Sequence, residues 1–357
     1  MPQIYEEYWD LTMAWTDFNG EKFLETLKLV IEFIDQHKNE DYSAESYKLL
    51  QQIVQKSVHI TEESVRKGIN ELVKLGFVYP FLHSYHSLSK QYLNTTSKEE
   101  RRLILSKIIY SNSSFKRSVT TESDIREINF VVKTLEHIKC LDEKYLGVLI
   151  STNINDYPEG YISLKQLEQL YNDEGQTEFE ERKYNQIGYL KGLLKKLDGI
   201  TYISKKFYLE KDTEKVQIES TQGIETKGRD PYLQRIYKQQ LQKESMDIFG
   251  RVKCMVEKLE YPVLIASHIK PFRSSNDDEA FDPNNGLLLS KTLDSLFDLN
   301  YISFADDGSI IFYKRVPEDV KQFWKTYKLD KRFINSERLG YLAYHRQLCN
   351  SKNNLLP

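Results

Sequence analysis

A histidine, an asparagine and two aspartates follow one another in the last third of the chain. His268 lies in the run LIASHIKPF, residues 264–272, and Asn285, Asp294 and Asp298 come after it. Alone, a histidine in such a run fits a buried structural residue, but the residues behind it favour chemistry. An imidazole takes up a proton near neutral pH, and carboxylates bind hard cations. The set is typical of metal-assisted hydrolysis of a phosphodiester.

Two strands and a helix would position these residues. The apolar run ahead of His268 predicts a strand that ends at the imidazole. The Asn285 amide is expected to bond loop backbone and hold the histidine in place, and Gly286 predicts a tight turn. Ser290 is the expected N-cap of a helix over KTLDSLFD, residues 291–298.

The expected helix places Asp294 and Asp298 at positions i and i+4, on one face. Two carboxylates at this spacing repel each other by about 0.2–0.5 kcal/mol. A divalent cation between them would turn this repulsion into binding. Oxygen ligands favour Mg²⁺ or Mn²⁺ over zinc.

The stretch from residue 254 to residue 313 closely resembles the HNH, or ββα-metal, nuclease domain in its restriction-endonuclease form. Four pieces carry the resemblance in order: ASHIKP, DPNNGLLLS, LDSLFD and ISFADDG; the later YLAYHRQLC also resembles the family. The resemblance extends over roughly residues 235–350. It implies that His268 is the general base, that Asp294 takes the place of the family's last histidine or asparagine as a metal ligand, and that Asp298 matches the aspartate of the LFD piece.

Two positions depart from the family pattern. Ser267 stands where the wider superfamily often has an aspartate or histidine ligand. Ser267 is therefore a weaker candidate for the third metal ligand, and water or DNA phosphate is the alternative. Cys254 lacks the second cysteine of many relatives, and no structural zinc is expected. Lys270 and Arg273 follow the base and are predicted phosphate contacts, with solvated turn charges as the alternative.

The N-terminal third predicts helices over residues 20–37, 43–57 and the run that begins at Thr61. This last run ends at Gly76 and is followed by FVYPF, so the segment near 42–90 resembles a winged helix-turn-helix. The alternatives are an amphipathic helix pair or a protein-binding module. Its predicted DNA contacts are Arg66, Lys67, Asn70 and Lys74.

A second winged-helix-like domain is predicted over 136–210, with Lys191 and Lys195 as its DNA contacts. We therefore expect a helical domain over 1–135, this second domain, a linker over 211–230, and a nuclease domain over 231–357. The fold class is α+β, mostly α.

Composition limits the remaining possibilities. The 357 residues are 40% hydrophobic and 29% charged, which excludes global disorder. No apolar run has the length of a membrane span, and three scattered cysteines agree with a reducing compartment, so a cytoplasmic location is expected. The net charge of −3 is uneven, because the last residues from 320 onward are basic.

These patterns predict a sequence-specific double-stranded DNA endonuclease like a type II restriction enzyme, using one Mg²⁺ or Mn²⁺. Cutting both strands with one such site per chain requires a homodimer or sequential nicking. A DNA methyltransferase is the expected functional partner. The alternatives are a DNA-binding regulator or modification-dependent reader with a weak or inactive HNH domain, and an RNA-directed nuclease, which the lack of a stacking platform disfavours.

Overall fold

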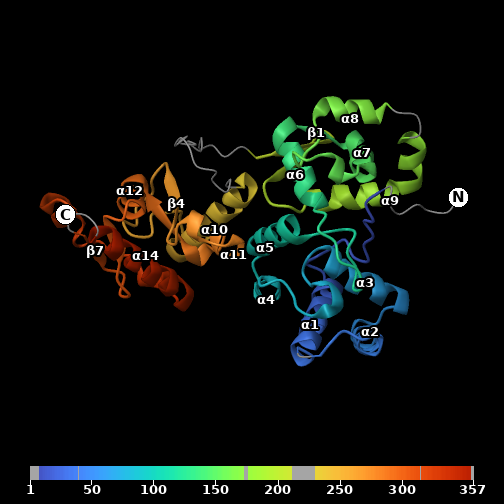
Figure 1. The fold of residues 1–357 in the computed structure, drawn as a ribbon, viewed down its shortest axis with the longest axis horizontal. Coiled ribbons are helices and arrows are strands. Elements are labelled where there is room, and N and C mark those ends of the chain that lie inside the picture. Colours follow the sequence, from blue (N-terminus) through green and yellow to red (C-terminus); the bar gives the residue numbers. More distant parts are fainter. Residues whose placement is uncertain (1–7, 39, 173–175, 211–229, 314, 355–357) are drawn as a thin grey trace. The chain divides into compact units, whose positions relative to one another are not determined.

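The computed structural model describes residues 8–38, 40–172, 176–210, 230–313 and 315–354 (Figure 1). Within them, helices predominate over three small antiparallel sheets, so the predicted α+β class is confirmed. The chain divides into two compact units, Met1–Lys211 and Asp212–Pro357. The linker predicted over 211–230 lies outside the described residues apart from Asp230.

The first unit is built mainly of helices around an apolar core. None of the helices formed by the described residues has the length and apolar character needed to cross a membrane. The unit's helices are α1 (Glu21–Gln36), α2 (Ala44–Val58), α3 (Glu62–Lys74), α4 (Ser89–Asn94), α5 (Lys98–Asn112), α6 (Glu127–Ile138), α7 (Leu146–Ser151), α8 (Leu164–Tyr171) and α9 (Gln176–Leu194).

Helix α3 begins and ends where the sequence predicts. The Thr61 side chain accepts a hydrogen bond from the Ser64 backbone N–H at 3.3 Å, which caps the helix. Gly76 adopts a φ of +87°, a conformation that a side chain would strain, and the helix ends just before it. Val78 then forms an isolated antiparallel bridge with Tyr85.

A three-stranded antiparallel sheet completes the first unit. Its strands are β1 (Leu141–Asp142), β2 (Ile200–Ile203) and β3 (Lys206–Leu209), in the spatial order β1–β3–β2. Strand β1 has only two residues, too few for an alternating pattern to appear in the sequence. Leu141 pairs with Phe207, and both side chains are fully buried.

The second unit surrounds two β-hairpins with helices. Strands β4 (Leu264–His268) and β5 (Gly286–Ser290) form one antiparallel pair, and β6 (Ile302–Phe304) and β7 (Ile310–Phe312) form the other. The helices of this unit are α10 (Pro231–Phe249), α11 (Asp277–Ala280), α12 (Lys291–Asp298), α13 (Glu318–Trp324) and α14 (Ser336–Asn354).

Helix α12 packs on β4 and β5, which gives the order strand, strand, helix. The Ser290 side chain accepts from the Leu293 N–H and caps the helix, so the predicted cap and helix bounds are confirmed. Leu293 and Phe297 lie one turn apart and are fully buried, which fixes the face that α12 turns to the hairpin.

Candidate active site

The last residue of β4 is His268, as the apolar run predicts. In the antiparallel register it pairs with Gly286, the first residue of β5, at the end of the hairpin that carries the long connecting loop. That loop holds the 3₁₀ turn η6 (Pro283–Asn285) and the helix α11. The imidazole is half-buried at this end, so it is held by the fold and still open to solvent.

The backbone fixes the tautomer of His268. Its Nε2 lies 2.9 Å from the carbonyl oxygen of Ala280, the last residue of α11. The final carbonyls of a helix lack intrahelical partners, and a carbonyl only accepts, so Nε2 carries the proton. In the neutral ring Nδ1 then carries the lone pair, and it is the nitrogen suited to take a proton from water.

Asn285 ties the connecting loop together through its amide. The side chain is fully buried, and its Oδ1 accepts from the Lys270 N–H at 2.6 Å. Its Nδ2 donates to the carbonyl of Glu279 at 2.9 Å and also reaches the Lys270 carbonyl and the Ser275 hydroxyl. Because Glu279 precedes the carbonyl that binds His268, the amide holds the segment that orients the imidazole.

Gly286 allows helix α10 to approach the hairpin closely and does not form the tight turn expected from the sequence. Its φ of −138° and ψ of 152° are extended, a conformation that any residue adopts. A Cβ at this position would lie 2.3 Å from the hydroxyl of Tyr237 and 2.8 Å from the Leu241 methyl, so a side chain does not fit. Helix α10 therefore crosses the hairpin directly over this residue.

Residues 254–305 match the family model described as HNH endonuclease. The matched HNH segment contains β4, β5, α12 and β6, with His268 and both aspartates inside it. No curated protein matches the chain. The match indicates nuclease activity on DNA for the second unit, and the first unit lies outside it.

The two aspartates of the HNH segment lie on the flank and at the end of α12. Asp294 follows the buried Leu293 and is half-buried, whereas Asp298 is the exposed last residue of the helix. Among the described residues, no group of three or more His, Cys, Asp and Glu side chains is placed to hold a metal ion. A site with one or two carboxylates still fits Mg²⁺, which keeps several waters and binds substrate phosphate.

Ser267 is more buried than His268 and leaves β4 on the other side. Successive side chains of a strand point to opposite faces, so Ser267 and His268 leave β4 on different sides. Ser267 is only 4% exposed. A hydroxyl this buried is poorly placed for a hydrated cation, so Asp294 and Asp298 remain the proposed protein ligands.

The two cations after the base differ in their partners. Lys270 Nζ contacts both carboxylate oxygens of Glu279, at 2.6 and 2.8 Å, and this hydrogen bonding lowers the pKa of Glu279. Arg273 is exposed, and no ion pair to it occurs among the described residues. A phosphate would compete with Glu279 for Lys270 but can contact Arg273 directly.

The predicted DNA contacts of α3 divide into surface and interior. Arg66 and Lys67 are exposed, with Lys67 paired to Glu63 at 2.7 Å. Asn70 is half-buried, and its Oδ1 accepts from the Val119 N–H at 2.9 Å. Its amide is thus engaged within the fold.

The position of Lys74 differs from the DNA-contacting one expected from the sequence. It is only 6% exposed, and its ammonium donates to the Asp10 carboxylate and carbonyl and to the Thr12 hydroxyl. Burial lowers its pKa despite the neighbouring Asp10. Because all its donors serve the interior of the first unit, Lys74 is not a DNA contact.

The lysines near the end of α9 also differ. Lys191 Nζ pairs with Glu143 at 2.6 Å, and this hydrogen bond raises the pKa of Lys191. Lys195 is exposed, with its ammonium 5.0 Å from the centre of the Tyr202 ring. Of the two, Lys195 is the more accessible to DNA.

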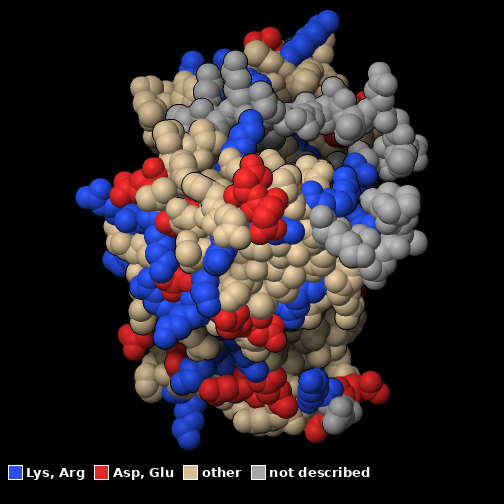
Figure 2. Space-filling model, turned by 90° about the vertical axis from the view of Figure 1, so that its left-hand side faces the viewer, with Lys and Arg blue, Asp and Glu red and all other residues tan. Residues whose placement is uncertain are grey.

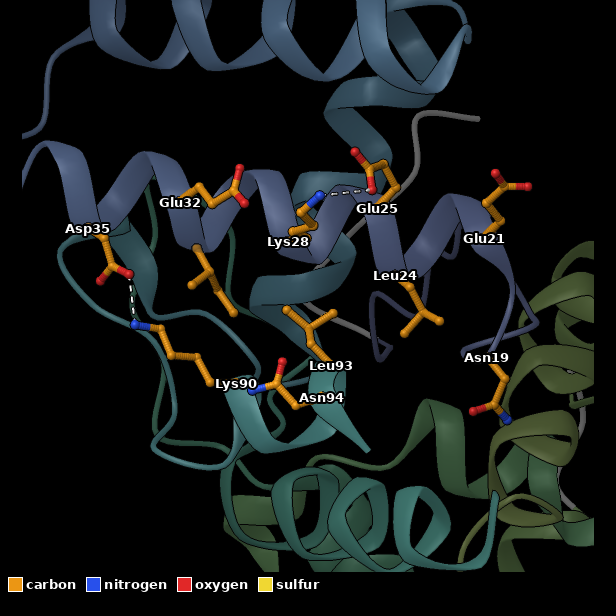
Figure 3. Close-up of a pocket in the computed structure, with 11 residues that line it drawn as sticks. Asn19, Glu21, Leu24, Glu25, Lys28, Glu32, Asp35, Lys90, Leu93 and Asn94 are labelled. Carbon is orange, nitrogen blue, oxygen red and sulfur yellow. Dashed lines mark ion pairs between the residues drawn. The ribbon is translucent and has the colours of Figure 1, made fainter. Parts of the chain in front are cut away.

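Charge on the surface is mixed. On the face drawn in Figure 2, Lys and Arg side chains are interspersed with Asp and Glu side chains. A hollow of about 680 Å³ between α1 and α4 is predominantly acidic, and Figure 3 shows its two lysines each paired with a carboxylate. This hollow would repel DNA phosphate. Its acidic residues are Glu21, Glu25, Glu32 and Asp35.

Two contributors to the site escaped the sequence analysis. Tyr237 of α10 stacks on the imidazole of His268, with ring centres 4.6 Å apart and planes at 16°. Arg338 of α14 donates to the Pro283 carbonyl at 2.9 Å, next to Asn285 in η6. Neither stands in a motif, and both lie outside the matched HNH segment.

Proposed function

We propose that the chain is a sequence-specific double-stranded DNA endonuclease of the type II restriction kind. The observation that carries the proposal is the protonated Nε2 of His268, held by the Ala280 carbonyl at the end of a strand–strand–helix unit. This arrangement leaves Nδ1 to remove a proton from the attacking water. Asn285 keeps the loop that supplies the carbonyl in place.

Asp294 and Asp298 would hold one Mg²⁺ or Mn²⁺, with water and DNA phosphate as further ligands. When bound, such an ion stabilises the negative charge that grows on the phosphate and on the leaving oxygen. Arg273 and Lys270 would contact phosphates beside the scissile bond, with Glu279 releasing Lys270 as DNA arrives. These roles belong to the chain's own residues and are testable one by one.

Recognition of the DNA site is assigned to the first unit. The sheet order β1–β3–β2, with α9 ahead of β2, supports a winged helix over 136–210. Helices α2 and α3, followed by the Val78–Tyr85 bridge, support another winged helix near 42–90. The proposal includes a homodimer or sequential nicking for two-strand cleavage, and a companion DNA methyltransferase.

Cleavage of phage or plasmid DNA tests the proposal. The purified chain with Mg²⁺ should yield discrete fragments, and chelation of the metal should stop the reaction. His268→Ala should bind the same DNA and leave it intact, because the general base is gone. His37→Ala is the matched control, since it removes an imidazole that bonds the Phe33 carbonyl in the first unit, outside both segments assigned to recognition, and it should cut normally.

Two results would contradict the proposal. Discrete binding without cleavage by the unmodified chain would favour a regulator or a reader of modified DNA. Random degradation at low protein concentration would exclude site specificity.

A further inference from the structure

Helix α10 contacts both β4, which ends at His268, and its partner β5, although it precedes the matched HNH segment. Asp230 caps its start by accepting from the backbone N–H groups of Tyr232 and Leu233. Two turns further on, Tyr237 is fully buried against the hairpin. The helix thus delivers one aromatic side chain to the inner face of the site.

Tyr237 contacts the site in two ways. Its ring lies nearly parallel to the imidazole of His268, which restricts rotation of that ring. Its hydroxyl donates to the Asn285 carbonyl at 3.0 Å and lies 3.4 Å from the Ser267 carbonyl. The same side chain therefore bridges the two strands where His268 pairs with Gly286.

Tyr237 and His268 are closely packed by their neighbours. A Cβ on Gly286 would collide with its hydroxyl. Phe272 meets the imidazole edge-on, with ring centres 5.8 Å apart and planes at 82°. Tyr237, Phe272 and the Ala280 carbonyl together enclose the ring of His268 on three sides.

A partly buried ion pair connects α10 to α14. Glu244, two turns beyond Tyr237, accepts both terminal nitrogens of Arg338 at 2.8 and 2.9 Å. Arg338 is fully buried and also donates to the Pro283 carbonyl in η6. One guanidinium thus connects α10 to the turn that contains Asn285.

We propose that Tyr237 is a positioning residue for His268, which keeps the Nε2–H tautomer and the orientation of Nδ1 toward the attacking water. The inference rests on the proposed nuclease function. Stacking keeps the imidazole from turning away from the Ala280 carbonyl, and the hydroxyl keeps the two strand ends together. A leucine keeps an apolar side chain at this position but supplies neither contact.

The experiment compares Tyr237→Leu and Tyr237→Phe in the full chain with Tyr301→Phe as the matched control. Tyr301 loses a hydroxyl whose contact is Arg315, away from β4, β5 and η6. For each variant we would measure thermal unfolding, and kcat and KM on a DNA that the unmodified chain cleaves. The ¹⁵N signals of His268 would be recorded at a fixed pH above 8. His268→Gln assigns those signals.

Tyr237→Leu should lower kcat about 10- to 100-fold with KM unchanged, because a small displacement of a catalytic group has effects of this size. Its His268 signals should show a mixture of the two neutral tautomers. Tyr237→Phe keeps the stack and should retain the single tautomer, with a kcat loss of about two- to tenfold because the hydroxyl contact is gone. Tyr301→Phe should match the unmodified chain in every measurement.

The inference is overturned if the folded Leu variant keeps the single tautomer, or if its kcat falls only as far as its folded fraction does. If the Leu variant does not fold, Tyr237→Phe is the test. A kcat equal to that of the unmodified chain then contradicts the proposal, and a lowered kcat at unchanged KM supports it. The tautomer is read without DNA, so an inactive unmodified chain refutes the nuclease function separately.

Discussion

Helices α3 and α12 are both short, amphipathic and capped by a hydroxyl residue, yet they use their polar residues in opposite ways. In α3, Glu71 and Lys74 turn inward and bind segments from the start of the chain. In α12, Asp294 and Asp298 stay half-buried or exposed beside the hairpin that ends at His268. The role of a charged residue on a helix thus depends on its burial and its partners and not on its type.

The largest expected effect is on α12. Asp294→Asn should lower the rate of DNA cleavage by at least about 100-fold, or roughly 3 kcal/mol, because a carboxamide binds a divalent cation poorly. The thermal unfolding temperature should change little, since the side chain is only half-buried. Initial rates over a series of Mg²⁺ concentrations measure the effect. Unchanged rates at low Mg²⁺ would remove Asp294 from the site.

The second effect belongs to α3. Lys74→Met should destabilise the first unit by about 2 kcal/mol, because Asp10 and Thr12 lose a buried donor. Lys67→Met, the exposed control on the same helix, should change stability by less than about 0.5 kcal/mol. Urea unfolding followed by tryptophan fluorescence in a Trp324→Phe background reports on the first unit alone. A stable Lys74→Met with weakened DNA binding would restore the DNA-contact role.

A pH dependence follows from Glu71. Burial raises the pKa of its carboxyl to about 8, although the backbone N–H groups of Trp15 and Ala14 oppose the shift. Between the ordinary value of 4.5 and about 8, the folded chain holds a proton that the unfolded chain releases. The free energy of unfolding of the first unit should therefore fall as pH rises through this window.

Glu71→Gln should flatten this slope, with urea unfolding at several pH values as the measurement. Some slope should remain, because burial also raises the pKa of Glu127 to about 7. An unchanged slope would show that Glu71 is ionised in the folded chain.

The smallest effect is expected at the surface. Lys195→Ala should weaken DNA binding about threefold across sequences and reduce the salt dependence by about one unit, as loss of one phosphate contact does. Lys191→Ala should do less, because Glu143 already binds that ammonium. Fluorescence anisotropy over a range of salt concentrations distinguishes the two. Equal losses of DNA affinity in the two variants would contradict the inference that Lys195 is the more accessible lysine.

Sequence reasoning succeeded where the determinants are local. The cap at Ser290 and the apolar positions of KTLDSLFD lie within a few residues of each other, and together they predicted the bounds of α12 correctly. The end of β4 followed in the same way from one apolar run. In these segments neighbouring residues alone determine the backbone.

The remaining features depend on distant partners. The Tyr237 hydroxyl finds its acceptor 48 positions away, and Lys74 finds Asp10 64 positions away. A lysine on an amphipathic helix looks the same in sequence whether its ammonium meets solvent or a buried carboxylate. The sequence around Gly286 likewise predicted a turn, because the helix that crosses over this residue lies elsewhere in the chain.

The Arg338–Glu244 pair has a consequence for the order of folding. It joins residues 94 positions apart, and contacts of such separation close late because a long loop must be ordered first. The matched HNH segment alone contains neither partner. A chain cut before α14 would carry His268 without this brace between α10 and η6.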